Sequence, residues 1–337
     1  MNTLSLSFII PVYNRPDEVN ELLESFVNLD GEFDYEIIIV EDGSNITSKE
    51  VVDSYSEVLN ISYYFKANSG PGDSRNFGMK KAKGNYFIIL DSDCLLPNQY
   101  LKTVFNNLNT NYADCFGGPD AAHKSFTSLQ KAINFVMTSF ITTGGIRGGK
   151  ASDKKFQPRS FNMGISKEAF EASKGFGVIH PGEDPDLSIR LNKLGFTTKL
   201  YNDAFVYHKR RISWSKFYTQ VHKFGLVRPI LNHWHPSTNR LVFWLPTLFC
   251  LLFIASIIFA ILGYKLFILL FGLYFLTAFL LALITTKSFI VAIQSILAIC
   301  VQFFGYGYGF LKSTVAIKVF NKEPEKQFPK LFFKHVE

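Results

Sequence analysis

Charged residues are scarce in this chain of 337 residues, where they make up 19% of the sequence; a soluble domain has about a quarter. The deficit is local, because residues 241–311 contain only two charged side chains, Lys265 and Lys287. So long an apolar stretch must be hidden in lipid or in a much larger core. The sequence therefore excludes a purely soluble protein. The residues before the stretch are numerous enough to form a domain with its own core.

Cysteine is also rare. The four cysteines are scattered, and two of them, Cys250 and Cys300, lie inside the apolar stretch. Their spacing fits neither a zinc site nor a disulfide framework, so we expect a reducing compartment. The N-terminus carries no basic leader, and Pro11 interrupts its apolar run, so the sequence predicts no signal peptide. We therefore expect a multi-pass protein of the inner (cytoplasmic) membrane, with its N-terminal domain in the cytosol.

Positive charge gathers beside the apolar stretch. Residues 201–240 carry seven basic side chains against one aspartate, and residues 312–337 carry six lysines against three glutamates, whereas the first 200 residues are net acidic. This distribution indicates attraction to anionic lipid headgroups. A nucleic-acid-binding protein would concentrate basic residues on its globular domain. We therefore expect membrane lipids, and no nucleic acid, as partners.

The apolar stretch divides into three segments, at 242–262, 266–284 and 289–311. Each is near the ~20 residues that a spanning helix needs. The lysine-rich tail, 312–337, should stay in the cytosol, which requires an even number of spans. The third segment should then lie flat in the membrane or re-enter it, because three full spans would export the lysines. We assign 241–311 to a membrane domain of two to three helices. Residues 213–240 are predicted to form an amphipathic interfacial helix or linker, the alternative being an ordinary domain helix.

The N-terminal half alternates between strand-like and helix-like segments. Strands are expected at 6–12, 35–40, 61–65 and 86–90, and helices at 16–29, 48–59 and 71–83. Continuous apolar strands separated by helices favour an α/β fold with a parallel sheet. Ligands of such sheets lie beyond the carboxyl ends of the strands, where polar clusters follow three of these strands.

Asp91 and Asp93 follow the apolar strand at 86–90. Residues i and i+2 of an extended chain face the same side, so the two carboxylates form a hard oxygen site suited to Mg²⁺ or Mn²⁺ on a diphosphate. The alternative is a solvated turn or a helix cap. His208 can complete such a metal site, although a lone histidine is more often structural.

Three further positions each have a structural and a functional interpretation. Asp42 precedes a glycine and forms a turn, or accepts a hydrogen bond from a ribose or a base. Arg75 stands where a dinucleotide fingerprint needs its third glycine, yet a helix N-terminus beside it suits a phosphate. Asp184, followed by Pro185, is a good helix cap, which leaves the upstream glycine-rich loop 142–158 unexplained. The cluster Lys209–Arg211 faces headgroups or binds a lipid diphosphate.

Six segments in this order resemble the inverting family 2 glycosyltransferases, whose catalytic domain has the GT-A fold, an α/β architecture. They are FIIPVYN (8–14), IIVEDGS (38–44), RNFGMKKAKG (75–84), FIILDSD (87–93), NMGI (162–165) and GEDPDLSIR (182–190). Weaker likenesses, QVHKFG (220–225) and YGYGF (306–310), resemble membrane-anchored members that build exopolysaccharide and other surface glycans on polyprenyl carriers, including succinoglycan-type enzymes. The likeness covers about residues 5–230, and the catalytic domain is assigned to 1–212.

The resemblance implies a role for each matching position. Asp184 would be the general base and would take the proton of the acceptor hydroxyl. The metal, Mg²⁺ or Mn²⁺, would be held by Asp93, Asp91 and His208. The nucleotide-diphospho-sugar donor would contact Pro11, Tyr13, Asp42, Arg75, Asp91 and Ser92. The acceptor or diphosphate side would include Glu183, Asn162, Arg210, Arg211 and Gln220.

The sequence departs from the processive synthases of that family. Those enzymes carry Gln-x-x-Arg-Trp, whereas Gln220 is followed by Lys223 and Phe224, and the apolar segments are too few for a polymer channel. We therefore expect transfer of one sugar to a polyprenyl-linked glycan acceptor. Two alternatives are glycosylation of polyprenyl phosphate itself, and a sugar-nucleotide sensor or scaffold without turnover.

Overall fold

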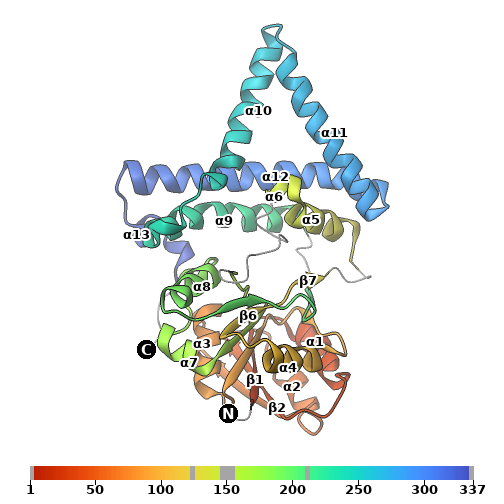
Figure 1. Cartoon of the computed structure of the whole chain (residues 1–337), viewed down its shortest axis with the longest axis vertical. Helices are drawn as coiled ribbons and strands as arrows, with labels where there is room; N and C mark the ends of the chain where they lie inside the picture. The colour runs from red at the N-terminus through yellow and green to blue at the C-terminus, as the bar shows by residue number, and fades with distance from the viewer. Residues whose placement is uncertain (1–3, 122–125, 145–155, 209–212, 334–337) are drawn as a thin grey trace. The chain divides into compact units, whose positions relative to one another are not determined.

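The computed structural model describes residues 4–121, 126–144, 156–208 and 213–333 (Figure 1). The chain divides into two compact units. The N-terminal unit comprises residues 1–123, 151–208 and 332–337, and the helical unit comprises residues 124–150 and 209–331.

A seven-stranded sheet with the order β3-β2-β1-β4-β8-β6-β9 forms the centre of the N-terminal unit. Its strands are β1 (Leu6–Val12), β2 (Tyr35–Asp42), β3 (Ile61–Lys66), β4 (Tyr86–Leu90), β6 (Cys115–Gly117), β8 (Asn162–Ser166) and β9 (Thr198–Leu200). β1 to β4 are parallel as predicted, but β8 runs antiparallel to both β4 and β6. The sequence predicted no direction for β8. Local hydrophobic alternation identifies a strand but not the direction in which it enters the sheet.

Helices cover both faces of this sheet. One face packs against α1 (Pro16–Val27), α2 (Lys49–Ser54) and α4 (Tyr100–Thr110), and the other against α3 (Pro71–Lys81), α7 (Lys167–Ser173) and α8 (Glu183–Lys193). Successive side chains of a strand point to opposite faces. Phe8 and Ile10 accordingly join the first core, and Ile9 joins the second. With both faces covered, the loops at the strand ends are left to form a site.

A small second sheet lies in the same unit. It consists of β5 (Cys94–Leu95), β10 (Val206–His208) and β7 (Asp120–Ala121), in the order β5-β10-β7. β10 runs antiparallel to β5, with His208 paired to Cys94. This pairing places His208 beside the turn at residues 91–93, although more than a hundred residues separate them in the chain.

The helical unit is built from long apolar helices. Its elements are α5 (Ser128–Thr138), α6 (Phe140–Thr143), α9 (Trp214–Trp234), α10 (Leu245–Ile261), α11 (Leu266–Thr286), α12 (Phe289–Thr314) and α13 (Pro324–Gln327). α5 and α6 belong to the helical unit although they precede residue 212, and the domain boundary at that residue stays a prediction. Ile133 and Val136 of α5 share a core with Ala278 and Ile299 of the apolar helices. No change in composition marks that transition in the sequence.

Three helices of this unit, at Leu241–Ile261, Leu266–Thr286 and Phe289–Val319, are long and apolar enough to cross a membrane, which suggests membrane association. Figure 1 shows α10 and α11 as a hairpin, and α12 running alongside α9. Glycines allow the close approach of α9 and α12: a Cβ atom added at Gly225 would lie 2.2 Å from the carbonyl oxygen of Tyr306. α9 therefore packs closely against α12, and the predicted interfacial position of α9 stays a prediction.

Candidate active site

The turn after β4 carries the predicted metal ligands. All of β4 is buried, and Asp93 lies largely buried just beyond it. Its Oδ1 lies 3.1 Å from Nε2 of His208, and its Oδ2 accepts a hydrogen bond from Arg15. Burial disfavours the charged form of Asp93, but the charges of His208 and Arg15 outweigh it and hold the pKa of Asp93 well below its usual range. Asp93 is therefore a carboxylate at neutral pH, as a metal ligand must be.

The residues around Asp93 fit a divalent cation. Ligand atoms of Asp93, Cys94 and His208 lie within 4.8 Å of one another. Burial raises the pKa of the Cys94 thiol well above its usual value, and Sγ donates to the carbonyl oxygen of Phe161 at 3.3 Å, so Cys94 is a poor ligand. Phe161 also stacks on the His208 ring, with centroids 4.9 Å apart. A carboxylate and an oriented imidazole remain, a donor pair that Mn²⁺ and related divalent ions accept.

Arg75 connects this turn to the start of α8. The side chain of Arg75 is buried; its Nη2 donates to Oδ1 of Asp91 at 2.8 Å, and its Nη1 donates to Oε1 of Glu183 at 3.1 Å. The guanidinium also lies 5.3 Å from the ring centroid of Phe176, a distance at which a cation and an aromatic ring attract each other. The predicted donor residues Arg75 and Asp91 are thus brought together with Glu183 in one ion-pair network.

Asp184 is the second residue of α8, which begins after Gly182 at φ +117°. The residue is partly exposed, but its Oδ1 is shielded from solvent and has no hydrogen-bond partner among the described residues. Burial, followed by the negative charge of Glu183, raises the pKa of Asp184 to about 6. Glu183 itself stays ionised: burial is outweighed by His180 and Arg75, and its pKa falls to about 2. A carboxylate with a pKa of this size and an unused oxygen is well suited to act as a general base.

Asp42 ends β2 and holds the turn that leads into α3. Its Oδ1 accepts from Nζ of Lys66 at 2.6 Å and from the backbone N–H of Ser69 at 3.0 Å, and its Oδ2 accepts from the N–H of Gly70 at 2.9 Å. The turn interpretation of Asp42 therefore applies in the structure. Its contact with a nucleobase stays a prediction.

Three other residues that were predicted to contact the donor, Pro11, Tyr13 and Ser92, differ in how exposed they are and in where they lie. Pro11 lies in β1 beyond Ile9, the last residue of β1 that pairs with β4, and the side chain of Tyr13 is 51% exposed. Ser92 is buried in the turn between Asp91 and Asp93.

Asn162, predicted on the acceptor side, is fully buried. Its Oδ1 accepts from the hydroxyl of Tyr100 at 2.6 Å, and its Nδ2 donates to the carbonyl oxygen of Ala204 at 2.8 Å, so both ends of the amide are used within the fold. Arg210 and Arg211 lie outside the described residues, and Gln220 lies on α9 of the helical unit.

Three charged or titratable partners of the site were not predicted from the sequence: Arg15 of Asp93, Lys66 of Asp42, and His180, whose Nδ1 lies 2.9 Å from Oε1 of Glu183. Two of them had a signal. Arg15 belongs to the polar cluster after the first strand, and Lys66 stands directly opposite Asp42 in the pairing of β2 with β3. No local pattern marks His180.

Comparison with known proteins identifies the class of domain. Residues 7–172 match the family model described as Glycosyl transferase family 2. The chain is 35% identical over 115 residues to the poly(ribitol-phosphate) beta-glucosyltransferase of Bacillus spizizenii, a match that covers 33% of this chain and 18% of that protein. It is 38% identical over 237 residues to the chondroitin synthase of Escherichia coli, covering 60% and 34% of the respective chains. The chain thus spans only part of these relatives.

A solved structure shares the fold. The mannosyltransferase PcManGT from Pyrobaculum calidifontis, in complex with GDP-Man and Mn²⁺, superposes with a TM-score of 0.57 at 16% identity, covering 89% of this chain and 86% of that one. Residues 7–172 therefore match the family 2 glycosyltransferase model, and the N-terminal unit has the GT-A fold that the sequence motifs predicted. The finer likeness to succinoglycan-type enzymes stays a prediction.

Proposed function

We propose that the chain is a metal-dependent, inverting glycosyltransferase of surface polysaccharide biosynthesis. It moves one sugar from a nucleotide-diphospho-sugar to a lipid-linked glycan acceptor on the cytosolic face of the membrane. One observation carries the proposal: Arg75 contacts both Asp91 and Glu183. Through Arg75, Asp91, which is assigned to the donor and the metal, is linked to the start of α8, where Asp184 follows Glu183.

The residues divide the chemistry between them. Asp184 takes the proton from the acceptor hydroxyl while the hydroxyl oxygen attacks the anomeric carbon. The bond between that carbon and the diphosphate oxygen breaks, and the nucleoside diphosphate leaves with the electron pair. Asp93 and His208 would hold Mg²⁺ or Mn²⁺, which neutralises the charge of the leaving group when bound. No general acid is needed, and a single displacement inverts the anomeric centre.

Two observations support the cofactor and the acceptor. PcManGT, which shares the fold, is described in complex with GDP-Man and Mn²⁺. The three long apolar helices favour an acceptor that is itself held in the membrane. Arg75 lies between the carboxylates of Asp91 and Glu183 and positions them.

The acceptor can be tested directly with the purified full chain in detergent. Labelled UDP-glucose, UDP-N-acetylglucosamine and GDP-mannose are each supplied with Mn²⁺ and either polyprenyl phosphate or a polyprenyl-diphosphate-linked disaccharide. Labelled product from the disaccharide carrier alone is the expected result. Product from bare polyprenyl phosphate would replace the proposal with carrier charging. Donor binding without product from either acceptor would favour a non-catalytic sensor.

A further inference from the structure

The dipeptide Phe332–Phe333, here named the tail dipeptide, belongs to the N-terminal unit, whereas residues 209–331 belong to the helical unit. Phe332 forms an isolated antiparallel bridge with Ile179, and the backbone N–H of Phe333 donates to the carbonyl oxygen of Val178 at 2.9 Å. The tail dipeptide thus provides a strand-like backbone partner for residues 176–182. This loop leads directly into α8 and Asp184.

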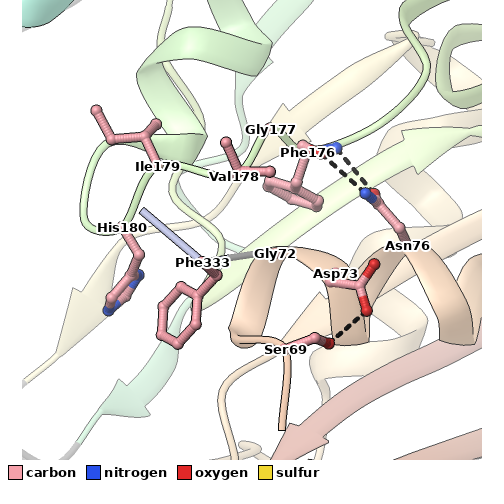
Figure 2. A pocket seen from close by; sticks show the side chains of 10 residues that line it. All are labelled: Ser69, Gly72, Asp73, Asn76, Phe176, Gly177, Val178, Ile179, His180 and Phe333. Atoms are coloured by element: carbon pink, nitrogen blue, oxygen red, sulfur yellow. Dashed lines mark hydrogen bonds between the residues drawn. The ribbon is translucent and has the colours of Figure 1, made fainter. Parts of the chain in front are cut away.

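The ring of Phe333 fills the space above a glycine. A Cβ atom added at Gly70 would come within 2.4 Å of the Phe333 ring, and Gly70 has φ +93°. Figure 2 shows the Phe333 ring beside the start of α3, on the side where His180 leaves the loop; the ring centroids of Phe333 and His180 are 6.1 Å apart. Only a residue without a side chain leaves room for the ring at this position.

Two residues that lie against the tail dipeptide, His180 and Gly70, are themselves hydrogen-bonded to candidate site residues. On the loop side, Nδ1 of His180 lies 2.9 Å from Oε1 of Glu183, the neighbour of Asp184. On the α3 side, the N–H of Gly70 donates to Oδ2 of Asp42. The tail dipeptide therefore packs against the two segments that lead into α3 and α8, the helices joined by the Arg75–Glu183 ion pair.

We propose that Phe333 is a positioning residue of the transferase: it holds the loop 176–182 so that Glu183 and Asp184 keep their places. The inference rests on the proposed function. The contacts described for Phe333 are with supporting backbone and ring atoms, and among the described residues none of them is with Asp91, Asp93 or Asp184. Loss of the ring should therefore lower turnover more than donor affinity, because a small displacement of a catalytic group slows the reaction steeply.

Three variants of the full chain test this role. Phe333→Ala should lower kcat about 10-fold or more, by the steep dependence of rate on geometry, while the dissociation constants of UDP and GDP, measured by calorimetry, stay within about twofold of wild type. Phe333→Leu, which keeps most of the apolar volume, should restore most of the loss. Phe320→Ala is the matched control, because Phe320 lies in the same C-terminal stretch but is 65% exposed; it should behave as wild type.

Gly70→Ala adds a test of the contact itself. Its added methyl group meets the Phe333 ring, so it should slow turnover less in a Phe333→Ala background than alone. Equal effects in both backgrounds would show that the ring does not lie on Gly70.

Hydrogen exchange of residues 177–182 reports on the loop without any turnover, and Phe333→Ala should speed it. The positioning role would be overturned if Phe333→Ala left the exchange rate or kcat unchanged. Higher turnover of this variant would also overturn it, because the ring would then inhibit the enzyme. Faster exchange in a chain whose wild type transfers no sugar would instead overturn the proposed function and keep the contact.

Discussion

The substitution Asp184→Asn tests the electrostatics and the chemistry of the site together. Burial and the charge of Glu183 raise the pKa of Asp184 to about 6 from its ordinary value of 3.8. A difference of roughly two pKa units corresponds to about 3 kcal/mol by which folding disfavours the ionised carboxylate. Asparagine has the same shape without the charge. The variant should therefore be more stable than wild type at neutral pH, by up to about 3 kcal/mol.

The gain should depend on pH with a defined sign. Because the folded-state pKa of Asp184 is raised, the penalty is absent where the group is protonated in both states. It grows as pH rises through the interval between the unfolded and folded pKa values, and is complete above the folded value. The stability difference between variant and wild type should thus be largest at pH 7.5 and fall to about 1 kcal/mol at pH 4.5. Thermal unfolding of the detergent-purified protein at both pH values measures it.

Activity should move in the opposite direction. Removing a general base costs about 10²–10⁴-fold in kcat, whereas binding of UDP and GDP should persist, because Asp42, Asp91 and Asp93 are intact. Asp186→Asn is the matched control on the same helix. Its carboxylate pairs with Arg190 at 2.8 Å, so this variant should lose stability at pH 7.5. Normal turnover of Asp184→Asn, or lower stability than wild type at pH 7.5, would refute the assignment.

Three other changes have defined outcomes. Asp93→Asn should weaken Mn²⁺ binding, measured by electron paramagnetic resonance, and lower turnover about 100-fold; wild-type Mn²⁺ affinity would remove Asp93 as a ligand. Arg75→Ala leaves the buried Glu183 without one of its cations and should cost about 3 kcal/mol in a urea titration, whereas a cost below about 1 kcal/mol would mean that water replaces the guanidinium. Gly225→Leu should lower the unfolding temperature of the full chain, while Gly272→Leu, where an added Cβ meets nothing within 4 Å, should not.

The part of the fold that depends on local pattern could be predicted from the sequence. Continuous apolar runs identified β1 to β4 and placed Asp91 and Asp93 just beyond one strand end. The rule that i and i+2 share a side does not apply there, because residues 91–93 form a turn, in which Asp91 pairs with Arg75 and Asp93 lies beside His208. The parts that depend on long-range pairing could not. The antiparallel direction of β8 and the pairing of β10 with β5, which brings His208 to Asp93, involve segments far apart in the chain. The chemistry of histidine made His208 a candidate ligand and the family resemblance supported it, but no spacing rule paired it with Asp93.

The ion pairs of the site likewise include some that local sequence pattern could predict and some that depend on long-range packing. Lys66 could have been paired with Asp42 from the register of two adjacent parallel strands. Arg15 follows β1 and Asp93 follows β4, which pairs with β1, so the polar clusters at these two strand ends gave a signal for this ion pair. The Arg75–Glu183 pair joins α3 to α8, so it follows only from the packing of the two helices on the sheet. The contact of Phe333 with Gly70 is of the same kind, since a phenylalanine in a polar tail has no periodic pattern to mark it.

The anomeric configuration of the transferred sugar tests the central claim most directly. One base, Asp184, acting on the acceptor while a nucleoside diphosphate leaves from the opposite side, permits only a single displacement. Nuclear magnetic resonance of the product formed by the full chain from an α-linked UDP-sugar should show a β linkage. An α-linked product would require a second displacement or a front-face attack and would contradict the assigned role of Asp184.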